Sequence, residues 1–401
     1  MRIGLVTGEF PPMQGGVGAF SERLAQALAA SGHRLHVISR RQARPEAPPG
    51  RRTPRAQLRD PVAMDWGLLH PVARRWGWGD IGKVVQLALR YELDVINIQY
   101  QAAAYNMRSP AINLAPWRLR GLAPVVVTFH DLRIPYLFPK AGRLRRYVVR
   151  LAAQKAHGVI ATNSEDYNTL QAWSLDNTQI RQFPIGSNII PRDVDREEIA
   201  GVRHRLGLDD GVFLLGFFGF LNASKGAGLL VDALSRQDAA VHLLLIGGRT
   251  GSSDRANNER LVQEVDELVR RRGLVERVHW TGFLPDRDIS THLRAADLMV
   301  MPYRDGASLR RGTLMAALAH GRPVLTTRPD RPVAEFVHGE NMWLIPAEDP
   351  QALAAAIKEL RENEALRRRL SAGASRLAGD FTWPEIAART VAFFEELVAD
   401  V

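Results

Sequence analysis

The sequence predicts two consecutive α/β domains, each built on a parallel β-sheet covered by helices. At 401 residues the chain exceeds what one hydrophobic core usually serves, so two domains of under about 200 residues each are expected. In both halves, short apolar runs rich in β-formers alternate with helical patterns, which is the signature of βαβ units. Hydrophobic residues make up 46% and charged residues 24% of the chain, as is typical of globular proteins.

The first half supplies five expected strands and one clear helix. The strands are Ile3–Val6, Leu35–Ser39, Val95–Ile98, Val125–Thr128 and Val159–Ala161, and the helix covers Ala19–Ala30. The stretch from Arg40 to Asp80 is irregular and rich in proline and arginine. Its length predicts a weakly ordered functional or mobile loop there, without a packed element.

The second half repeats the pattern. Its expected strands are Phe213–Phe218, Val241–Ile246, Val278–Trp280, Leu298–Met301 and Val324–Thr326. A charged segment between Pro191 and Asp210 separates the halves and marks the boundary. We therefore expect domains at 1–192 and 193–380. The last helix, at 381–401, has a proline near its first turn and is expected to cross back onto the first domain.

Composition excludes several kinds of chemistry. Without cysteine the chain has no disulfide, thiol nucleophile or Cys-ligated metal. The N-terminus shows no secretory signal and no apolar run is long enough for a membrane span, which predicts a cytoplasmic protein. Basic residues outnumber acidic ones by 53 to 43, and only five of them are lysines. This excess suits anionic partners or surfaces, although an ordinary arginine-rich solvated surface is the competing interpretation.

Two motifs in the first half follow strand ends. The loop between Gly8 and Gly18 contains Gly15 and Gly16 and leads into a helix, where backbone amides and the helix N-terminus receive anions. Its spacing is not that of a dinucleotide-binding loop, and a structural tight turn is the alternative. A second strand delivers His130 and Asp131 to the carboxyl end of the sheet, where an imidazole exchanges protons or binds a sugar hydroxyl. A structural His-Asp pair is the alternative.

Two motifs in the second half suit a diphosphate. After the strand ending at Phe218, a loop carries Lys225, a compact cation able to neutralise a leaving phosphate. Further along, a loop runs into a short apolar helix whose first turn combines free amides with polar and basic side chains. The candidate phosphate ligands are Gly219, Lys225, Gly226, Ser308, Arg310, Arg311 and Thr313. Solvated arginines are the competing interpretation at the second loop.

The ordered set of motifs resembles the retaining family 4 glycosyltransferases. The segments that carry the resemblance are Gly15-Gly16, Thr128-Phe129-His130-Asp131, Pro184-Ile185-Gly186-Ser187-Asn188, Gly219, Lys225-Gly226, Gly282-Phe283-Leu284 and Ala319-His320-Gly321-Arg322-Pro323-Val324. The resemblance implies the GT-B fold, two Rossmann-like domains facing each other across a cleft. It places His130 beside the transferred sugar, Lys225 on the diphosphate, Gly16 near donor phosphate or acceptor, and the nucleotide base near Gly282-Phe283-Leu284.

Two departures from the family pattern stand out. The family usually has an arginine directly after the glycine of the lysine loop, where this chain has Phe220. Arg310 and Arg311 are the hypothetical substitutes. The two carboxylates of the family's paired-glutamate motif align with Ser308 and Ala316 when counted back from Gly321. Counting forward from Pro302 instead brings Asp305 near the first of them.

The prediction is a glycosyltransferase that moves a sugar from a nucleotide-diphosphate sugar to a sugar, lipid-linked or small-molecule acceptor hydroxyl. The resemblance implies retention of anomeric configuration, no metal held by the protein and no cofactor besides the donor. A non-catalytic relative and a nucleotide-sugar epimerase on the same fold remain alternatives. Basic, aromatic-interleaved segments at Arg74–Trp78 and Lys140–Arg150 suggest an anionic membrane surface, at the inner face, as a further partner. No motif supports nucleic-acid binding.

Overall fold

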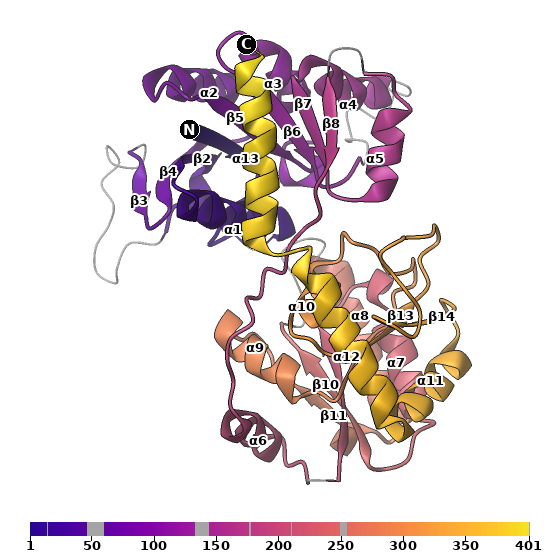
Figure 1. The fold of residues 1–401 in the computed structure, drawn as a ribbon. Coiled ribbons are helices and arrows are strands. Elements are labelled where there is room, and N and C mark those ends of the chain that lie inside the picture. Colours follow the sequence, from indigo (N-terminus) through magenta and orange to yellow (C-terminus); the bar gives the residue numbers. More distant parts are fainter. Residues whose placement is uncertain are drawn as a thin grey trace, which may run out of the picture. The chain divides into compact units, whose positions relative to one another are not determined.

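The computed structural model describes residues 1–13, 15–45, 60–132, 144–175, 178–209, 211–248 and 255–400. The chain forms two compact domains (Figure 1). The N-terminal domain comprises Met1–Gly186 together with Trp383–Val401, and the C-terminal domain comprises Ser187–Thr382. The divisions therefore fall after Gly186 and after Thr382, where the sequence had suggested residues 192 and 380.

The N-terminal domain is built on an eight-stranded sheet of order β3-β4-β2-β1-β5-β6-β7-β8. All neighbours pair in parallel except β3 and β4, which are antiparallel. The strands are β1 (Arg2–Thr7), β2 (Arg34–Arg40), β3 (Val62–Met64), β4 (Gly67–Ala73), β5 (Val95–Tyr100), β6 (Val125–Phe129), β7 (Gly158–Ala161) and β8 (Gln179–Gln182). The helices are α1 (Gly16–Ala30), α2 (Trp78–Arg90), α3 (Ala111–Leu119), α4 (Leu144–Lys155), α5 (Ser164–Gln171) and α13 (Trp383–Ala399).

The stretch from Arg40 to Asp80 corrects one expectation. Residues 46–59 lie outside the described part of the chain, but the remainder contains β3 and β4. β4 pairs with β2 along its length and buries Leu69, His70 and Ala73, so it is a packed element of the sheet. The sequence concealed this strand because Pro71 interrupts the apolar pattern, and proline is tolerated near the edge of a sheet.

Two hydrophobic clusters cover the two faces of this sheet, one beneath α2, α3 and α4 and the other beneath α1 and α13. α13 packs against α1, where the rings of Phe20 and Trp383 meet edge to face with centroids 5.2 Å apart. Gly158 allows this close packing, because a Cβ atom there would lie 2.6 Å from Phe393. The last helix of the chain thus belongs to the core of the N-terminal domain.

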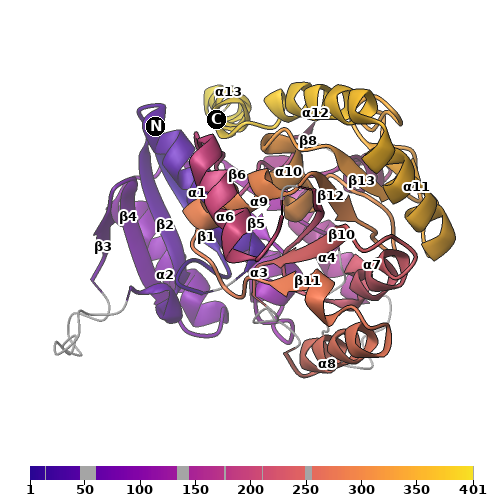
Figure 2. The same cartoon turned by 90° about the horizontal axis from the view of Figure 1, so that it is seen from below.

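The C-terminal domain has a six-stranded parallel sheet of order β11-β10-β9-β12-β13-β14. The strands are β9 (Phe213–Phe218), β10 (Val241–Ile246), β11 (Val278–Trp280), β12 (Leu298–Met301), β13 (Val324–Thr327) and β14 (Trp343–Ile345). The helices are α6 (Arg196–Arg205), α7 (Ala227–Leu234), α8 (Arg255–Arg271), α9 (Asp286–Ala295), α10 (Gly312–Ala319), α11 (Pro350–Glu362) and α12 (Glu364–Gly379). Figure 2 shows α7 beside α8 and α11 beside α12.

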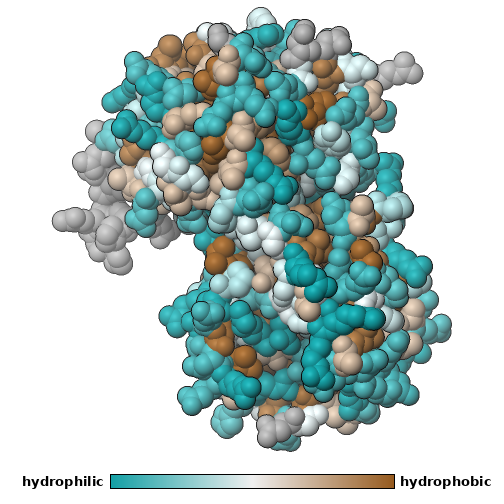
Figure 3. Space-filling view, viewed as in Figure 1, coloured by the Kyte–Doolittle hydropathy of each residue, from teal (hydrophilic) through white to brown (hydrophobic). Residues whose placement is uncertain are grey.

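Both sheets confirm the expected fold class of two Rossmann-like α/β domains. Their strands read as apolar runs because each sheet is covered on both faces, which removes the alternation of a half-exposed strand. On the face drawn in Figure 3, hydrophilic side chains predominate and hydrophobic ones are interspersed. Within the described ranges, no helix combines the length and apolar character that crossing a bilayer requires.

Candidate functional site

Three loops meet at the carboxyl ends of β9, β10 and β11. Each begins near a glycine with positive φ: Gly219 at 106°, Gly247 at 112° and Gly282 at 69°. The Cβ position of Gly247 lies 3.7 Å from the Gly219 backbone, and Gly247 forms an isolated bridge with Gly282. Ligands of open parallel sheets bind at this edge. Sequence reasoning singled out Gly219 and Gly282 but missed Gly247, although a glycine pair directly after β10 was a signal.

Lys225 reaches back over the first of these glycines. It ends the 3₁₀ turn η4 (Ala223–Lys225), and a Cβ atom on Gly219 would lie 2.5 Å from its Nζ. The next residue, Gly226, adopts φ 70° and packs so closely that its Cβ position lies 2.0 Å from the Pro302 carbonyl oxygen. Burial, assisted by the charge of Arg311, lowers the pKa of Lys225 to about 7.

Arg311 stands beside this lysine at the start of α10. Its guanidinium donates to Ser224 Oγ at 3.1 Å, pairs with Asp305 and lies 4.5 Å from the ring centroid of the buried Tyr303. The Tyr303 hydroxyl is 2.9 Å from Thr313 Oγ1 in the first turn of α10. Among the described residues, no side chain caps this helix N-terminus, and its amides begin beside Lys225 and Arg311. Tyr303 and Ser224 were not among the predicted site residues, whereas Asp305 is the carboxylate that the sequence brings near the first acid of the family motif.

The remaining predicted residues of the C-terminal domain occupy the surrounding loops. Ser308 accepts a bond from the Arg310 amide at 3.2 Å, and the Arg310 side chain is exposed. Phe283 follows Gly282 with 72% of its surface exposed, beside the half-buried Leu284. Ala316, where the family motif has a carboxylate, is fully buried in α10. An aliphatic residue in the core therefore takes the place of that acid.

In the N-terminal domain, the glycine loop holds an anion that the sequence did not predict. The carboxylate of Glu9 accepts bonds from the amides of Val17 at 3.1 Å and Gly18 at 3.3 Å, at the N-terminus of α1. A Cβ atom on Gly15 would lie 2.1 Å from Glu9 Oε1 and would displace this carboxylate, whereas the space beside Gly16 is open. Burial raises the pKa of Glu9 against the effect of these bonds. The anion-binding amides are thus occupied by the chain's own carboxylate.

A buried chain of amides orients His130. Asn97 Nδ2 donates to the Val126 carbonyl at 3.3 Å and to Thr128 Oγ1 at 2.9 Å. Its Oδ1 accepts a hydrogen bond from the side-chain Nε2 of Gln99. Gln99 Oε1 then lies 2.9 Å from His130 Nε2. Gln99 Oε1 is a carbonyl oxygen and can only accept a hydrogen bond. His130 must therefore carry its proton on Nε2 to donate it.

His130 is therefore a neutral imidazole with its Nδ1 as an acceptor. Burial lowers its pKa to about 3, and its ring packs edge to face on Phe20 with centroids 4.7 Å apart. The neighbouring Asp131 is buried and accepts a bond from Gln101 Nε2 at 3.1 Å. The structure thus brings Gln99, which was not predicted, onto the histidine. Its signal was the presence of two buried polar residues, Asn97 and Gln99, in one strand.

Two models of protein domains match this chain. One, described as a glycosyl transferase 4-like domain, matches residues 15–186, and the other, described as glycosyl transferases group 1, matches residues 212–363. The chain is a family 4 glycosyltransferase. This family 4 enzyme is 24% identical over 412 residues to the phosphatidyl-myo-inositol mannosyltransferase of Mycobacterium leprae, covering 98% of its own chain and 96% of the relative.

Solved structures show the same fold for this glycosyltransferase. Sucrose-phosphate synthase from Thermosynechococcus elongatus superposes with a TM-score of 0.75 at 22% identity over 100% of both chains. HepE of Anabaena, solved with UDP and glucose, superposes with a TM-score of 0.73 at 21% identity over 99% of this chain and 100% of that one. These likenesses confirm the GT-B class. The two domain models confirm the prediction of a glycosyltransferase, an enzyme that acts on a sugar donor.

Proposed function

We propose that this glycosyltransferase binds a nucleoside-diphosphate sugar on its C-terminal domain and transfers the sugar with retention of configuration, without a metal held by the protein and without a cofactor besides the donor. The observation that carries the proposal is the convergence of Lys225, Arg311 and the N-terminus of α10 at one edge of the sheet. Desolvation makes the Lys225 charge unfavourable in the free protein. The negative charge of a diphosphate beside Lys225 would stabilise the protonated form and offset the desolvation.

The chemistry follows from these charges. As the bond between sugar and diphosphate breaks, negative charge grows on the leaving phosphate, and fixed cations and helix amides stabilise that charge without reorganising. In a retaining front-face route, the leaving phosphate oxygen takes the proton of the acceptor hydroxyl. On the N-terminal domain, the Nδ1 of His130 is available to accept a hydrogen bond from a sugar hydroxyl. Gly282, Phe283 and Leu284 supply the region for the base.

A ligand screen tests the donor site. The melting temperature is measured with UDP, GDP, ADP and dTDP and with their sugar conjugates. A ligand at 100 times its Kd stabilises the protein by about 2.7 kcal/mol, enough for a shift of a few degrees. The UDP-bound HepE structures make UDP and UDP-glucose the first ligands to test.

Two lysine variants show whether a shift in melting temperature comes from binding at the predicted donor site. Lys225→Ala should abolish the shift, while Lys358→Ala, at an exposed lysine on α11, should keep it. A shift that survives Lys225→Ala would contradict the site. Nuclear magnetic resonance of the product then reports its anomeric configuration, and turnover in the presence of EDTA reports the requirement for a metal.

We further propose that α2, α3 and α4 of the N-terminal domain lie on an anionic membrane surface that carries a lipid-linked acceptor. These neighbouring helices expose Trp78 at 52%, Trp117 at 57% and Tyr147 at 54%. Exposed arginines accompany them, such as Arg118 beside Trp117 and Arg146 beside Tyr147. Aromatic rings next to basic groups suit the interface of a bilayer. Within the segment Lys140–Arg150, residues 140–145 lie outside the described side chains.

Vesicle sedimentation tests this surface. Vesicles of phosphatidylglycerol should sediment the protein at low salt, vesicles of phosphatidylcholine should not, and Trp78→Ser/Trp117→Ser should reduce the bound fraction several-fold. Equal sedimentation of the double variant, or none of the wild type at low salt, would refute the membrane proposal and leave these side chains as ordinary solvated surface.

A further inference from the structure

A second pocket of the C-terminal domain lies at the opposite edge of the sheet from the donor loops. Its cavity has a volume of about 590 Å³. Phe213 begins β9, Asp297 directly precedes β12 and Arg322 lies just before β13. Because these strands are parallel, their amino ends form the edge away from Gly219, Gly247 and Gly282. The pocket is therefore separate from the predicted diphosphate site on the same domain.

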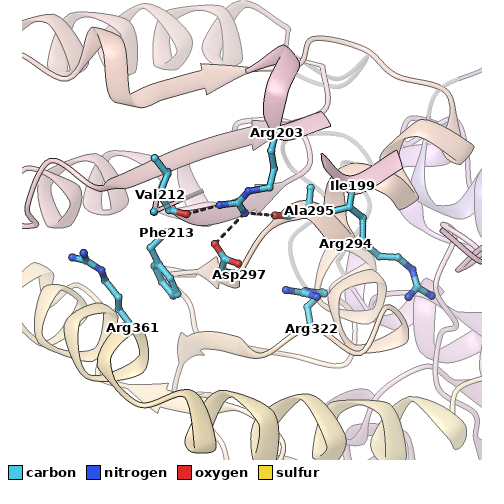
Figure 4. Close-up of a pocket in the computed structure, with 10 residues that line it drawn as sticks. Ile199, Arg203, Val212, Phe213, Arg294, Ala295, Asp297, Arg322 and Arg361 are labelled. Atoms are coloured by element: carbon cyan, nitrogen blue, oxygen red, sulfur yellow. Dashed lines mark hydrogen bonds and ion pairs between the residues drawn. The ribbon is translucent and has the colours of Figure 1, made fainter. Parts of the chain in front are cut away.

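Positive charge dominates the lining of this pocket. It contains four arginines and a single carboxylate: Arg203, Arg294, Arg322, Arg361 and Asp297. Figure 4 shows Arg361 on one side of Asp297, and Arg322 and Arg294 on the other. Asp297 Oδ2 is already engaged, since it accepts from the Leu214 amide at 2.7 Å and pairs with Arg203 at 3.2 Å. Arg361 pairs with Asp238, which is not part of the lining.

Two of the arginines lack an ion-pair partner in the described part of the chain. Among the residues that the structure describes, neither Arg294 nor Arg322 forms an ion pair with a carboxylate, and the Nε atom of each is buried without a hydrogen-bond partner. Burial lowers the pKa of Arg322, Asp297 opposes this effect, and the charges of Arg294 and Arg203 add to it. A buried donor left unpaired on a charged group is costly, which points to a missing acceptor.

Hydrogen bonds from arginines to the carbonyl groups at the end of α9 explain only part of this cluster. Arg203 donates to the carbonyl of Ala295, the last residue of α9, at 3.0 Å, and Arg322 donates through Nη2 to Ala296. Arginine at a helix C-terminus is favourable for this reason alone. The interaction leaves the Nε atoms of Arg294 and Arg322 unexplained, and it does not require an open cavity of this size.

We propose that this pocket binds a phosphorylated small molecule whose phosphate accepts bonds from Arg294 and Arg322 and whose remainder lies against Phe213. Phosphate oxygens match the fork of the guanidinium group and neutralise the excess positive charge. A cavity of 590 Å³ falls within the range of small-molecule sites, of roughly 300 to 1,000 Å³, and exceeds what a single phosphate fills. Phe213, which is 8% exposed, and Ile199 are apolar residues of the lining.

Calorimetric titration with glucose 6-phosphate tests the proposal. Lys225→Ala serves as the background, because it removes the predicted donor contact and leaves the second pocket intact. Adding Arg294→Gln should weaken binding about tenfold, as loss of a charge-assisted bond predicts. This side chain makes no hydrogen bond or ion pair within the described residues, so the variant should fold. Arg322→Lys keeps the charge but removes Nε, and should also weaken binding. Arg270→Gln, at an exposed arginine on α8, is the matched control.

The other probes decide what the pocket recognises. Glucose should not bind, and inorganic phosphate should bind more weakly than glucose 6-phosphate. Phosphate that binds as tightly as glucose 6-phosphate would overturn the assignment to a small molecule. Absence of binding to the Lys225→Ala protein at low salt, or equal affinity in the Arg294→Gln variant, would overturn the site altogether. None of these results depends on the nucleotide preference of the donor site.

Discussion

Lys225 places its ammonium group against Gly219, where its pKa lies near 7. In the free enzyme it is largely neutral at pH 8, and a bound diphosphate should raise its pKa and protonate it. We expect the affinity for a nucleotide sugar to fall up to tenfold per pH unit above about pH 7. Titration calorimetry at pH 8 in two buffers of different ionisation enthalpy should detect uptake of nearly one proton.

Two variants separate this effect from general electrostatics. Lys225→Ala should bind weakly and without proton uptake, whereas Lys358→Ala should behave like the wild type. Absence of net proton uptake, or a Kd independent of pH between 7 and 9, would mean that the lysine is already charged in the free enzyme. In that case desolvation does not lower the pKa of Lys225 enough to leave it neutral before the donor binds.

Gln99 governs a second residue-scale property, the tautomer of His130. Gln99→Leu removes the acceptor for the Nε2 proton, so we expect a mixture of tautomers and a fall of about tenfold in kcat. The Kd for nucleotides should stay unchanged, because those contacts lie on the other domain. Gln99→Glu retains an acceptor but should raise the imidazole pKa and shift the pH profile upward. If the nitrogen-15 resonances of His130 stay unchanged in Gln99→Leu, the hydrogen-bonded side chains of Asn97 and Gln99 do not set its tautomer.

At the scale of elements, the N-terminus of α10 is the part of the fold that we expect to bind the donor diphosphate. Its N-terminus has no side-chain cap from the part of the chain that the structure describes, and Arg310 and Arg311 precede its first turn. We expect Arg310→Ala/Arg311→Ala to weaken donor binding by about tenfold or more, because both cations that could replace the missing family arginine are removed. The control is Arg304→Ala, which removes an exposed arginine paired with Glu348. Unchanged donor affinity in the double variant would defeat the substitution hypothesis.

At the scale of the whole molecule, buried histidines make the fold sensitive to acid. Burial lowers the pKa of His70 and of His320 to about 4 and that of His130 to about 3. In the unfolded chain these groups take up protons below about pH 6.5, whereas the folded protein excludes them. Stability should therefore be full above about pH 6.5 and be lost progressively as the pH falls toward 4.

Urea unfolding at pH 7.5 and pH 5.0 measures this loss. Each such histidine can cost up to about 2 kcal/mol at pH 5. His320→Gln should reduce the pH dependence of the C-terminal domain, because its ring bonds Ser290 Oγ and the Ala316 carbonyl within that domain. A denaturation midpoint equal at both pH values would show that the three rings are already protonated or exposed.

How far the sequence reaches is visible in particular elements. The strands Phe213–Phe218, Val241–Ile246, Val278–Trp280 and Leu298–Met301 were predicted to the residue. Apolar residues dominate these runs, which only Gly216, His242 and His279 interrupt, so local chemistry suffices. The pattern failed at β4, where Pro71 interrupts it, and at β8, whose residues Gln179–Gln182 are polar except for Ile180. Both strands owe their place to pairing with a neighbouring strand and not to their own composition.

The sequence by itself determined the two-domain α/β architecture, the family and the loops after the strands, because these depend on periodicity and on short motifs. Only the tertiary structure decided which side chains meet. It brought Arg311 beside Lys225, Gln99 onto His130, Glu9 onto the start of α1, and Arg294 and Arg322 to one pocket. Such partners come from different strands and helices, and their distances depend on sheet order and burial, which no local pattern encodes.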